Sequence, residues 1–318
     1  MTWKVLVTPR TFGKTDPVPR EMLIKAGCEV VPNPFGRMLT EDELISLGGD
    51  VDGIIGGLDP FTRRVMENCR NLKAISRYGV GVNNVDLEYA SARGIMVTNT
   101  PGANSAAVAE LAIALIMAAA RKVCCSDRAI RQGVWKQYHG MQLSGKTIGI
   151  VGTGQIGRET AELARGLRMK VLCNDIMPNR DWASAIGAEY VKLERLIRES
   201  DYVSVHVPYN EDTHHLISSE QFASMKQSAI VVNTARGGII DETALCEALA
   251  SGRIAGAALD VFETEPPSGS PLLAMDNVVL TSHIGAHTQE AVENMGRMAA
   301  QNLIMCLSGA TPANVVTN

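Results

Sequence analysis

One glycine-rich segment places the strongest constraint on how this chain folds. The apolar run Lys146–Val151 predicts a buried parallel strand, and Arg158–Gly166 has helical composition. Between them, Gly152, Gly154 and Gly157 follow the G-x-G-x-x-G spacing. In a strand–turn–helix unit the first glycine permits a tight turn, the second admits a pyrophosphate, and the third lets helix and strand pack closely. The segment therefore predicts a dinucleotide site at a helix N-terminus, where unpaired N–H groups attract phosphate.

An acidic residue beyond this segment indicates which dinucleotide is bound. Asp175 follows Gly157 by 18 residues, at the end of the next apolar run, Val171–Cys173. A carboxylate at this strand end accepts hydrogen bonds from the ribose hydroxyls of NAD and repels the 2′-phosphate of NADP. The pattern therefore predicts NAD as the cofactor.

Length and charge narrow the class of protein. A chain of 318 residues exceeds one comfortable hydrophobic core, so we expect two domains. The formal net charge of −4 gives no reason to expect nucleic acid or an anionic membrane as a partner. The apolar segment 106–120 contains Glu110, is rich in alanine and is too short to span a membrane. We interpret it as a helix buried between domains.

The cysteines indicate the compartment. Seven cysteines are scattered along the chain, and none forms a C-x-x-C pair. This pattern is typical of free thiols in a reducing cytoplasm and argues against disulfides and a zinc site. Lys4, Arg10 and Lys14 interrupt the N-terminus before an apolar block long enough for a signal peptide forms. We therefore expect a cytoplasmic protein with no metal site.

Short apolar runs alternate with stretches of helical length along the chain. The strand candidates are Lys4–Thr8, Gly53–Ile55, Leu72–Ile75, Ile95–Thr98, Lys146–Val151, Val171–Cys173, Tyr202–Val207, Ala229–Asn233, Gly256–Leu259 and Val278–Thr281. Their alternation with helices predicts an α/β protein with two doubly wound parallel sheets, the smaller one flavodoxin-like. A helix from Thr288 to Leu307 follows the last strand. We expect a discontinuous substrate-binding domain of residues 1–100 and 288–318, and an NAD-binding Rossmann domain of residues 101–287.

Three reactive side chains follow strand ends of the predicted Rossmann domain, namely Arg236, Glu265 and His283. Sites in such folds gather at the carboxyl ends of the strands. Hydride transfer to a keto acid needs a cation to hold and polarise the substrate, a proton donor near neutral pH, and an anion to orient that donor. Each residue alone could be an ordinary surface charge, but together, beside a dinucleotide site, they predict a catalytic group.

These segments together resemble the D-isomer-specific 2-hydroxyacid dehydrogenases, and within that family the phosphoglycerate dehydrogenase branch. The motifs that carry the resemblance are Tyr78–Asp86, Gly152–Gly157, Asn233–Gly238, Ala258–Phe262 with Glu265 and Pro266, and His283–Ala286. They extend over nearly the whole chain and occur in the order of the family. The resemblance implies an NAD-dependent oxidoreductase that acts on the CH–OH group of a small 2-hydroxy acid.

The resemblance also implies a role for each site residue. His283 would act as general acid and base, Glu265 would fix its tautomer, and Arg236 would clamp the substrate carboxylate and polarise the C2 oxygen. The residues that would contact NAD are Gly152, Gly154, Gln155, Ile156, Gly157, Asp175, Val207, Pro208, Thr234, Ala235, Asp260, Gly285 and Ala286, with Asp260 accepting from the carboxamide. The residues that would contact the substrate are Arg77, Gly79, Val80 and Gly81. Members of the family are commonly homodimers, with helices around 106–121 and Trp135 at the interface.

The identity of the substrate rests on fewer residues. Arg77 resembles an arginine that can meet the substrate phosphate in phosphoglycerate dehydrogenases, which favours 3-phosphoglycerate. The loop Gly56–Pro60, however, lacks a second arginine that those enzymes often carry. A glyoxylate, hydroxypyruvate or broad 2-keto-acid reductase is therefore the alternative, and an NAD(H)-binding transcriptional co-repressor is a minor one. Since the chain ends at Asn318 without the regulatory domains of longer relatives, we expect no serine feedback through such a domain.

Overall fold

The computed structural model describes residues 2–317, which divide into two compact units. Unit 1 comprises the chain up to Asn104 together with the segment from Ala286 onward, and unit 2 comprises Ser105–Gly285. The domain boundaries expected from the sequence, at 100/101 and 287/288, lie a few residues from these.

Unit 1 is built on a five-stranded parallel sheet in the order β2-β1-β3-β4-β5. Its strands are β1 Trp3–Val7, β2 Cys28–Pro32, β3 Gly53–Gly56, β4 Ala74–Arg77 and β5 Met96–Thr98. Its helices are α1 Val18–Lys25, α2 Glu41–Gly48, α3 Arg63–Asn68, α4 Leu87–Ala92 and α12 Gln289–Leu307. This strand order is the flavodoxin-like one, as predicted.

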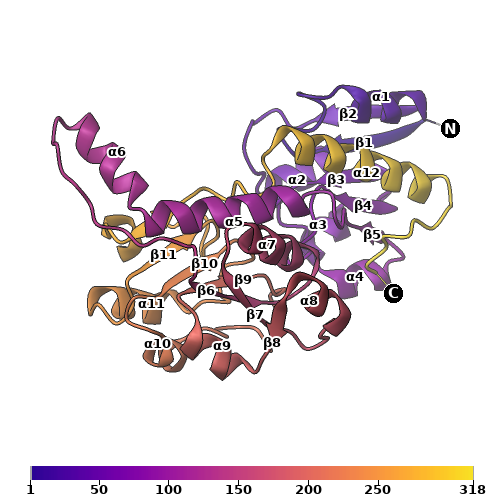
Figure 1. Cartoon of the computed structure of the whole chain (residues 1–318). Coiled ribbons are helices and arrows are strands. Elements are labelled where there is room, and N and C mark those ends of the chain that lie inside the picture. The colour runs from indigo at the N-terminus through magenta and orange to yellow at the C-terminus, as the bar shows by residue number, and fades with distance from the viewer. Residues whose placement is uncertain (1, 318) are drawn as a thin grey trace. The chain divides into compact units, whose positions relative to one another are not determined.

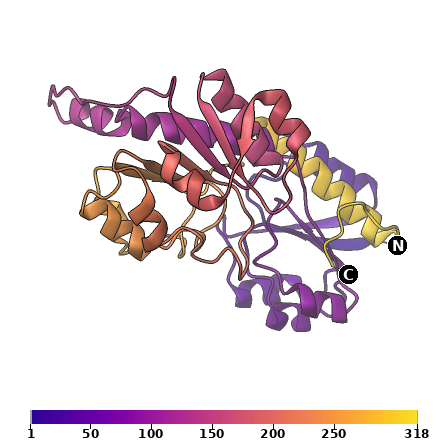
Figure 2. The same ribbon diagram turned by 60° about the horizontal axis from the view of Figure 1, so that its bottom comes forward.

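Helices cover both faces of the unit 1 sheet because successive strand residues point to opposite sides. In β3, Ile54 packs with α2, α3 and α4, whereas Ile55 packs with α1 and α12. Figure 2 shows the yellow helix α12 on one side of this sheet and the purple helices α2, α3 and α4 on the other, whereas α1 packs beside α12. Thr288 caps α12 by accepting a hydrogen bond from Ala291 N at 3.1 Å. The predicted helix 288–307 is therefore present.

Unit 2 contains a seven-stranded parallel sheet in the order β12-β11-β10-β9-β6-β7-β8. Its strands are β6 Thr147–Val151, β7 Lys170–Asn174, β8 Ala188–Tyr190, β9 Tyr202–Val205, β10 Ile230–Asn233, β11 Gly256–Leu259 and β12 Val278–Leu280. Its helices are α5 Ser105–Ala120, α6 Val123–Arg131, α7 Gln155–Gly166, α8 Arg180–Ile186, α9 Leu193–Glu199, α10 Ser219–Ser224, α11 Glu242–Ala250 and the 3₁₀ helix Pro271–Ala274. The order reverses between β6 and β9, and in such sheets ligands bind at the carboxyl ends beside this reversal.

The core of unit 2 also lies on both faces of its sheet. Ile150 packs with α5 and α7, whereas the next residue, Val151, packs with the cluster of α9, α10 and α11. Figure 1 shows α5 and α7 on one side of this sheet and α9, α10 and α11 on the other. The fold predicted from the sequence, two doubly wound parallel sheets with a Rossmann unit, is confirmed.

The helix α5 covers the sheet of its own unit, where it packs on α7 and over β10, β11 and β12. Among the helices of the described residues, none combines the length and the apolar character needed to cross a membrane.

The strand predictions were complete in the interior of each sheet and incomplete at one edge. All ten predicted strands are present, with ends that differ by at most two residues. The sequence missed β2 and β8, which are the edge strands of their sheets. Both are only partly buried, so neither shows the continuous apolar run of an interior strand. The helix after the glycine-rich turn begins at Gln155 rather than at Arg158.

Candidate active site

The three predicted catalytic residues come from adjacent strands of unit 2. Arg236 follows β10, Glu265 follows β11 and His283 follows β12. These strands are parallel neighbours in the order β12-β11-β10, so their carboxyl ends lie along one edge of the sheet. The topology thus collects a cation, a carboxylate and an imidazole at that edge.

Glu265 and His283 are in direct contact. Glu265 Oε2 lies 2.8 Å from His283 Nδ1, and Glu265 Oε1 accepts a hydrogen bond from Phe262 N at 3.2 Å. Burial acts to raise the pKa of Glu265, but the hydrogen bond and charge of His283 outweigh it and hold that pKa below its usual range. An ionised Glu265 therefore orients the ring through Nδ1, and the other ring nitrogen, Nε2, is the one that can exchange a proton with a substrate.

The backbone of His283 is held in an uncommon conformation by Asp260. His283 has φ of +53°, in the left-handed region that residues other than glycine seldom adopt. Its N–H donates to Asp260 O at 2.9 Å. The Asp260 carboxylate accepts from Thr281 Oγ1 at 2.6 Å and from the N–H groups of Ile284 and Gly285 at 2.8 Å each. Asp260 thereby fixes the turn that aims the imidazole.

Asp260 was predicted from the resemblance to accept a hydrogen bond from the nicotinamide carboxamide. The side chain is 1% exposed and already accepts the three bonds given above. A carboxylate offers about four lone-pair sites, so one site on Oδ2 remains for a ligand. The sequence did not reveal that Asp260 also shapes the His283 turn.

Arg236 lies in a turn that its neighbours define. Asn233 Oδ1 accepts from Ala235 N at 2.9 Å, and Asn233 Nδ2 donates to Arg236 O at 2.8 Å, so the side chain that ends β10 closes this turn. Burial lowers the pKa of Arg236, while the charge of Glu265 acts in the opposite direction. A guanidinium stays protonated in proteins, so Arg236 presents a positive charge beside the Glu265–His283 pair.

The glycine-rich turn fits a pyrophosphate. Gly152 has φ of +92°, and a Cβ there would lie 2.8 Å from the carbonyl carbon of His206. A Cβ on Gly157 would overlap Gly152 O, whereas Gly154 has open space around it. Gly154 is the N-cap of α7, and Gln155 and Ile156 form its first turn. The backbone N–H groups at this end of α7 are thus accessible to phosphate oxygens.

Asp175 has a second role that its position alone did not predict. Its Oδ2 accepts from Thr153 N at 2.5 Å and from Thr153 Oγ1 at 2.9 Å, and its Oδ1 accepts from Met177 N at 2.8 Å. Burial acts to raise the pKa of Asp175, but these hydrogen bonds lower it below its usual range. Asp175 is therefore a carboxylate that braces the glycine-rich turn at the strand end where a ribose is expected.

Further features at this edge of the sheet fit a dinucleotide. The buried hydroxyl of Thr234 has no hydrogen-bond partner among the described residues, and a ligand would satisfy it. Val207 and Pro208 follow β9, next to the backbone that faces Gly152. Ala235 follows Thr234, Gly285 contacts Asp260, and Ala286 is the first residue of the second segment of unit 1.

One histidine at the end of β9 was missed by the sequence reasoning. His206 Nε2 lies 2.9 Å from Ser204 Oγ, and burial lowers the pKa of His206 to about 4. The imidazole is therefore neutral at physiological pH. The backbone of His206, rather than its ring, lies beside Gly152 of the glycine-rich turn. No local motif distinguished it from the five other histidines of the chain.

Arg77 does not present its guanidinium to solvent. The residue is 2% exposed, Nη1 donates to the carbonyl oxygens of Gly56 and Gly57, and Nε donates to Gly81 O at 3.2 Å. These bonds tie the loop after β3 to the loop after β4. The structure thus shows Arg77 bracing two loops through Nη1 and Nε, and its contact with a substrate phosphate stays a prediction.

The glycine-rich loop of unit 1 does offer free donors. Among the described residues, the backbone N–H groups of Gly79, Val80 and Gly81 donate to no other group, whereas Gly79 O accepts from Thr100 N at 3.0 Å and Val80 O from Asn99 Nδ2 at 2.8 Å. The carbonyls are thus anchored and the amides are left for a ligand. Successive unpaired amides are a frequent anion-binding arrangement.

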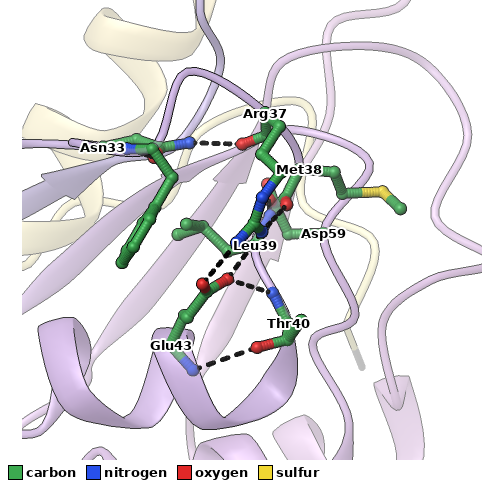
Figure 3. A network of polar contacts seen from close by, with 8 residues as sticks. Asn33, Arg37, Met38, Leu39, Thr40, Glu43 and Asp59 are labelled. Atoms are coloured by element: carbon green, nitrogen blue, oxygen red, sulfur yellow. Dashed lines mark hydrogen bonds and ion pairs between the residues drawn. The ribbon is translucent and has the colours of Figure 1, made fainter.

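A buried aspartate stabilises the loop after β3. Asp59 is 2% exposed, accepts from Leu39 N at 2.7 Å and also accepts from Thr8 Oγ1. Figure 3 shows Leu39 next to the ion pair of Arg37 with Glu43, whose carboxylate also accepts from Thr40 N at 2.9 Å. The loop after β3 is therefore anchored to the segment before α2, and Leu58 at its tip is 46% exposed.

Comparison with known proteins identifies the family. Residues 113–285 match the model of the D-isomer specific 2-hydroxyacid dehydrogenase NAD binding domain. A glyoxylate reductase of Korarchaeum cryptofilum is 45% identical over 97% of this chain and 96% of its own length. The chain belongs to this family. It is an NAD-dependent oxidoreductase that acts on the CH–OH group of 2-hydroxy acids.

Other family members carry different names. A D-3-phosphoglycerate dehydrogenase of Archaeoglobus fulgidus is 46% identical over 79% of this chain and 48% of its own length. The crystal structure of an Aquifex aeolicus D-lactate dehydrogenase, solved with NAD and lactic acid, superposes with a TM-score of 0.85 at 28% identity and covers 99% of both chains. The family and its NAD-binding domain are thus established, and the particular 2-hydroxy acid is a separate question.

Proposed function

We propose that this dehydrogenase reduces a small, unphosphorylated 2-keto acid of the glyoxylate or hydroxypyruvate class with NADH. The burial of Arg77 carries this proposal, because the sequence argument for a phosphorylated substrate rested on that side chain. A phosphate group is recognised mainly by charge-assisted hydrogen bonds from arginine or lysine. The loop after β3 contains no cation between Gly56 and Pro60 and carries the exposed Leu58 at its tip. The name of the Korarchaeum cryptofilum relative agrees with this choice.

In the proposed mechanism, His283 gives a proton to the C2 oxygen through Nε2. Glu265 holds Nδ1 and stabilises the imidazolium that exists before this transfer. Arg236 holds the substrate and polarises its carbonyl group, a task for which the planar guanidinium is suited. The free amides of Gly79, Val80 and Gly81 bind the substrate carboxylate. The glycine-rich turn and Asp175 would hold NADH, and this cofactor would supply the hydride that reduces C2.

Replacing Arg77 with alanine tests the substrate assignment. Loss of the guanidinium leaves the carbonyls of Gly56, Gly57 and Gly81 without their donor, so we expect the free energy of unfolding to fall by about 1–3 kcal/mol. We expect kcat/KM to change to the same extent for glyoxylate, hydroxypyruvate and phosphohydroxypyruvate. Arg70→Ala, at an exposed arginine, is the control and should behave like the wild type. A roughly 10- to 150-fold loss of kcat/KM that is confined to phosphohydroxypyruvate would show that Arg77 binds the substrate phosphate. That result would favour phosphoglycerate dehydrogenase as the activity.

Asp175 is expected to select NAD. Its carboxylate repels a 2′-phosphate and accepts from ribose hydroxyls, so the wild type should use NADH far better than NADPH. Asp175→Ser should narrow the ratio of the two kcat/KM values, whereas Asp181→Ser, at an exposed aspartate of α8, should leave it unchanged. Equal use of both cofactors by the wild type would disprove the assignment.

We also propose that the protein is a homodimer. In unit 2, α6 and the loop after it extend away from the sheet, beyond the end of α5 (Figure 1). This arm exposes large apolar side chains, with Trp135 87% exposed and Val123 and Ile130 just over half exposed. Exposed apolar surface of this kind favours association. Sedimentation equilibrium should give twice the mass of the chain, and Trp135→Glu should weaken the assembly. A wild-type monomer at all concentrations would contradict the proposal.

A cytoplasmic location is supported by the cysteines. All seven are free, and four of them are buried in the core. Free thiols of this number persist in a reducing compartment.

A further inference from the structure

A histidine and three carboxylates cluster beside the predicted catalytic residues of unit 2. His215 Nε2 lies 3.1 Å from Glu263 Oε1, and its Nδ1 lies 3.7 Å from Asp241 Oδ2. Asp241 caps α11, and Glu242 is the first residue of that helix. Glu263 belongs to the loop after β11 that also carries Glu265. None of these four residues has a part in the mechanism proposed above.

Glu242 and Glu263 bind each other's backbone. Glu242 N donates to Glu263 Oε1 at 3.1 Å, and Glu263 N donates to Glu242 Oε1 at 2.6 Å. The start of α11 is thus joined to the Glu265 loop by two reciprocal hydrogen bonds, each from a backbone N–H to a carboxylate. Bonds with one ionised partner are about twice as strong as neutral ones.

His215 extends this connection to the chain segment that follows Arg236. His215 N donates to Gly238 O at 2.7 Å, and Asp241 N donates to Ile217 O at 3.0 Å, so the segment 215–217 pairs with 238–241. Gly237 lies against the backbone of Phe262, since any Cβ there would overlap the Phe262 carbonyl oxygen. The turn with Arg236 and the loop with Glu265 are therefore fastened together at several points.

The arrangement of His215 does not favour a metal ion. The ring meets one carboxylate through each nitrogen, so the imidazole lies between Asp241 and Glu263. Three ligands of one cation would instead direct one atom each to a common centre. In addition, Asp241 Oδ2 already accepts from Ser218 Oγ at 2.8 Å.

We propose that His215, Glu242 and Glu263 form a clamp that positions Glu265 relative to Arg236. This inference rests on the catalytic roles proposed above for Arg236, Glu265 and His283. Glu265 uses Oε1 on Phe262 N, the residue before Glu263, so a shift of the loop at Glu263 moves the carboxylate that orients His283. The three clamp residues are positioning residues and do not touch the substrate.

The variant Glu263→Ala tests the clamp through turnover and its dependence on pH. We expect kcat with glyoxylate, per NADH-binding site counted by fluorescence titration, to fall by about 10- to 100-fold, since a misplacement of about 1 Å has this effect. KM for NADH should stay near its wild-type value. The pH at which turnover falls should shift to lower pH, as it should in Glu265→Gln, because the imidazolium loses its anionic partner.

Matched variants separate positioning from a general loss of structure. Glu263→Gln keeps an oxygen that accepts from Glu242 N, so it should recover most of kcat. Glu247 is an exposed glutamate of α11, the helix that begins with Glu242, and Glu247→Ala should have the kcat and pH profile of the wild type. The proposal would be overturned if Glu263→Ala kept the wild-type kcat or lost kcat without the pH shift. It would also be overturned if Glu263→Gln lost as much kcat as Glu263→Ala. If Glu263→Ala does not fold, His215→Ala is the variant to use. It should show a smaller loss of kcat with the same shift of the pH profile. An unchanged pH profile in His215→Ala would likewise overturn the clamp.

The controls also distinguish failure of the clamp from failure of the proposed function. If the wild type reduces glyoxylate and His283→Ala does not, while Glu263→Ala remains fully active, only the clamp is wrong. If the wild type reduces no 2-keto acid, the proposed function is wrong, and the clamp is rejected with it.

Discussion

Replacing His283 with alanine is expected to lower kcat for 2-keto acid reduction by about 10²- to 10⁴-fold, the usual contribution of a positioned general acid. The imidazole follows β12, its Nδ1 is held by Glu265 at 2.8 Å, and its backbone is fixed by Asp260. The variant lacks the proton donor but keeps the glycine-rich turn and Asp175, so NADH should bind as in the wild type. Steady-state kinetics and fluorescence titration of NADH measure the two effects separately.

A second histidine serves as the control for this experiment. His139 lies on the exposed loop after α6, and His139→Ala should leave kcat unchanged. Near-normal turnover in His283→Ala would remove His283 from the mechanism. A loss of NADH binding equal to the loss of kcat would instead mean that the residue supports the cofactor site.

Replacing Arg236 with glutamine is expected to lower kcat/KM by about 10²- to 10³-fold, because a partly buried positive charge that stabilises the developing oxyanion is lost. The guanidinium lies next to the Glu265–His283 pair, and its turn is set by Asn233. Arg236→Lys keeps the charge but lacks the planar pair of donors, so it should recover only part of the activity.

Kinetics with glyoxylate and titration of NADH check this prediction in both Arg236 variants. A kcat/KM near the wild-type value in Arg236→Gln would exclude the guanidinium from substrate binding. A full recovery in Arg236→Lys would show that charge alone, without the planar geometry, is sufficient.

The sequence predicted the interior of both sheets and the residues at their strand ends. Buried parallel strands are continuous apolar runs, so their ends are visible in the sequence, and Arg236, Glu265 and His283 follow such ends directly. The glycine spacing from Gly152 to Gly157 reports a backbone requirement that only glycine meets. These are local signals, and the fold and the family followed from them.

Contacts between distant segments were not predictable in the same way. Thr153 donates to Asp175, and Glu242 and Glu263 exchange hydrogen bonds, yet each pair is separated by about twenty residues with no periodic pattern. The edge strands β2 and β8 were missed because partial burial mixes polar residues into their sequences.

Arg77 illustrates the same difficulty at a site residue. The resemblance to phosphoglycerate dehydrogenases suggested that Arg77, just before the Gly79–Gly81 loop, offers its charge to a substrate phosphate. In the structure three carbonyl oxygens accept from the guanidinium, one from the last residue of β3, one from the loop after β3 and one from Gly81. The pairing of β3 with β4 brings these carbonyls to Arg77, and the local sequence around Arg77 contains no sign of them.

NADH oxidation by the wild-type protein with glyoxylate, hydroxypyruvate and phosphohydroxypyruvate tests the proposed reaction most directly. We predict that glyoxylate and hydroxypyruvate are reduced with a higher kcat/KM than phosphohydroxypyruvate, and that NADPH replaces NADH poorly. Reduction of phosphohydroxypyruvate alone, or oxidation of NADH with none of the three acids, would contradict the proposed function.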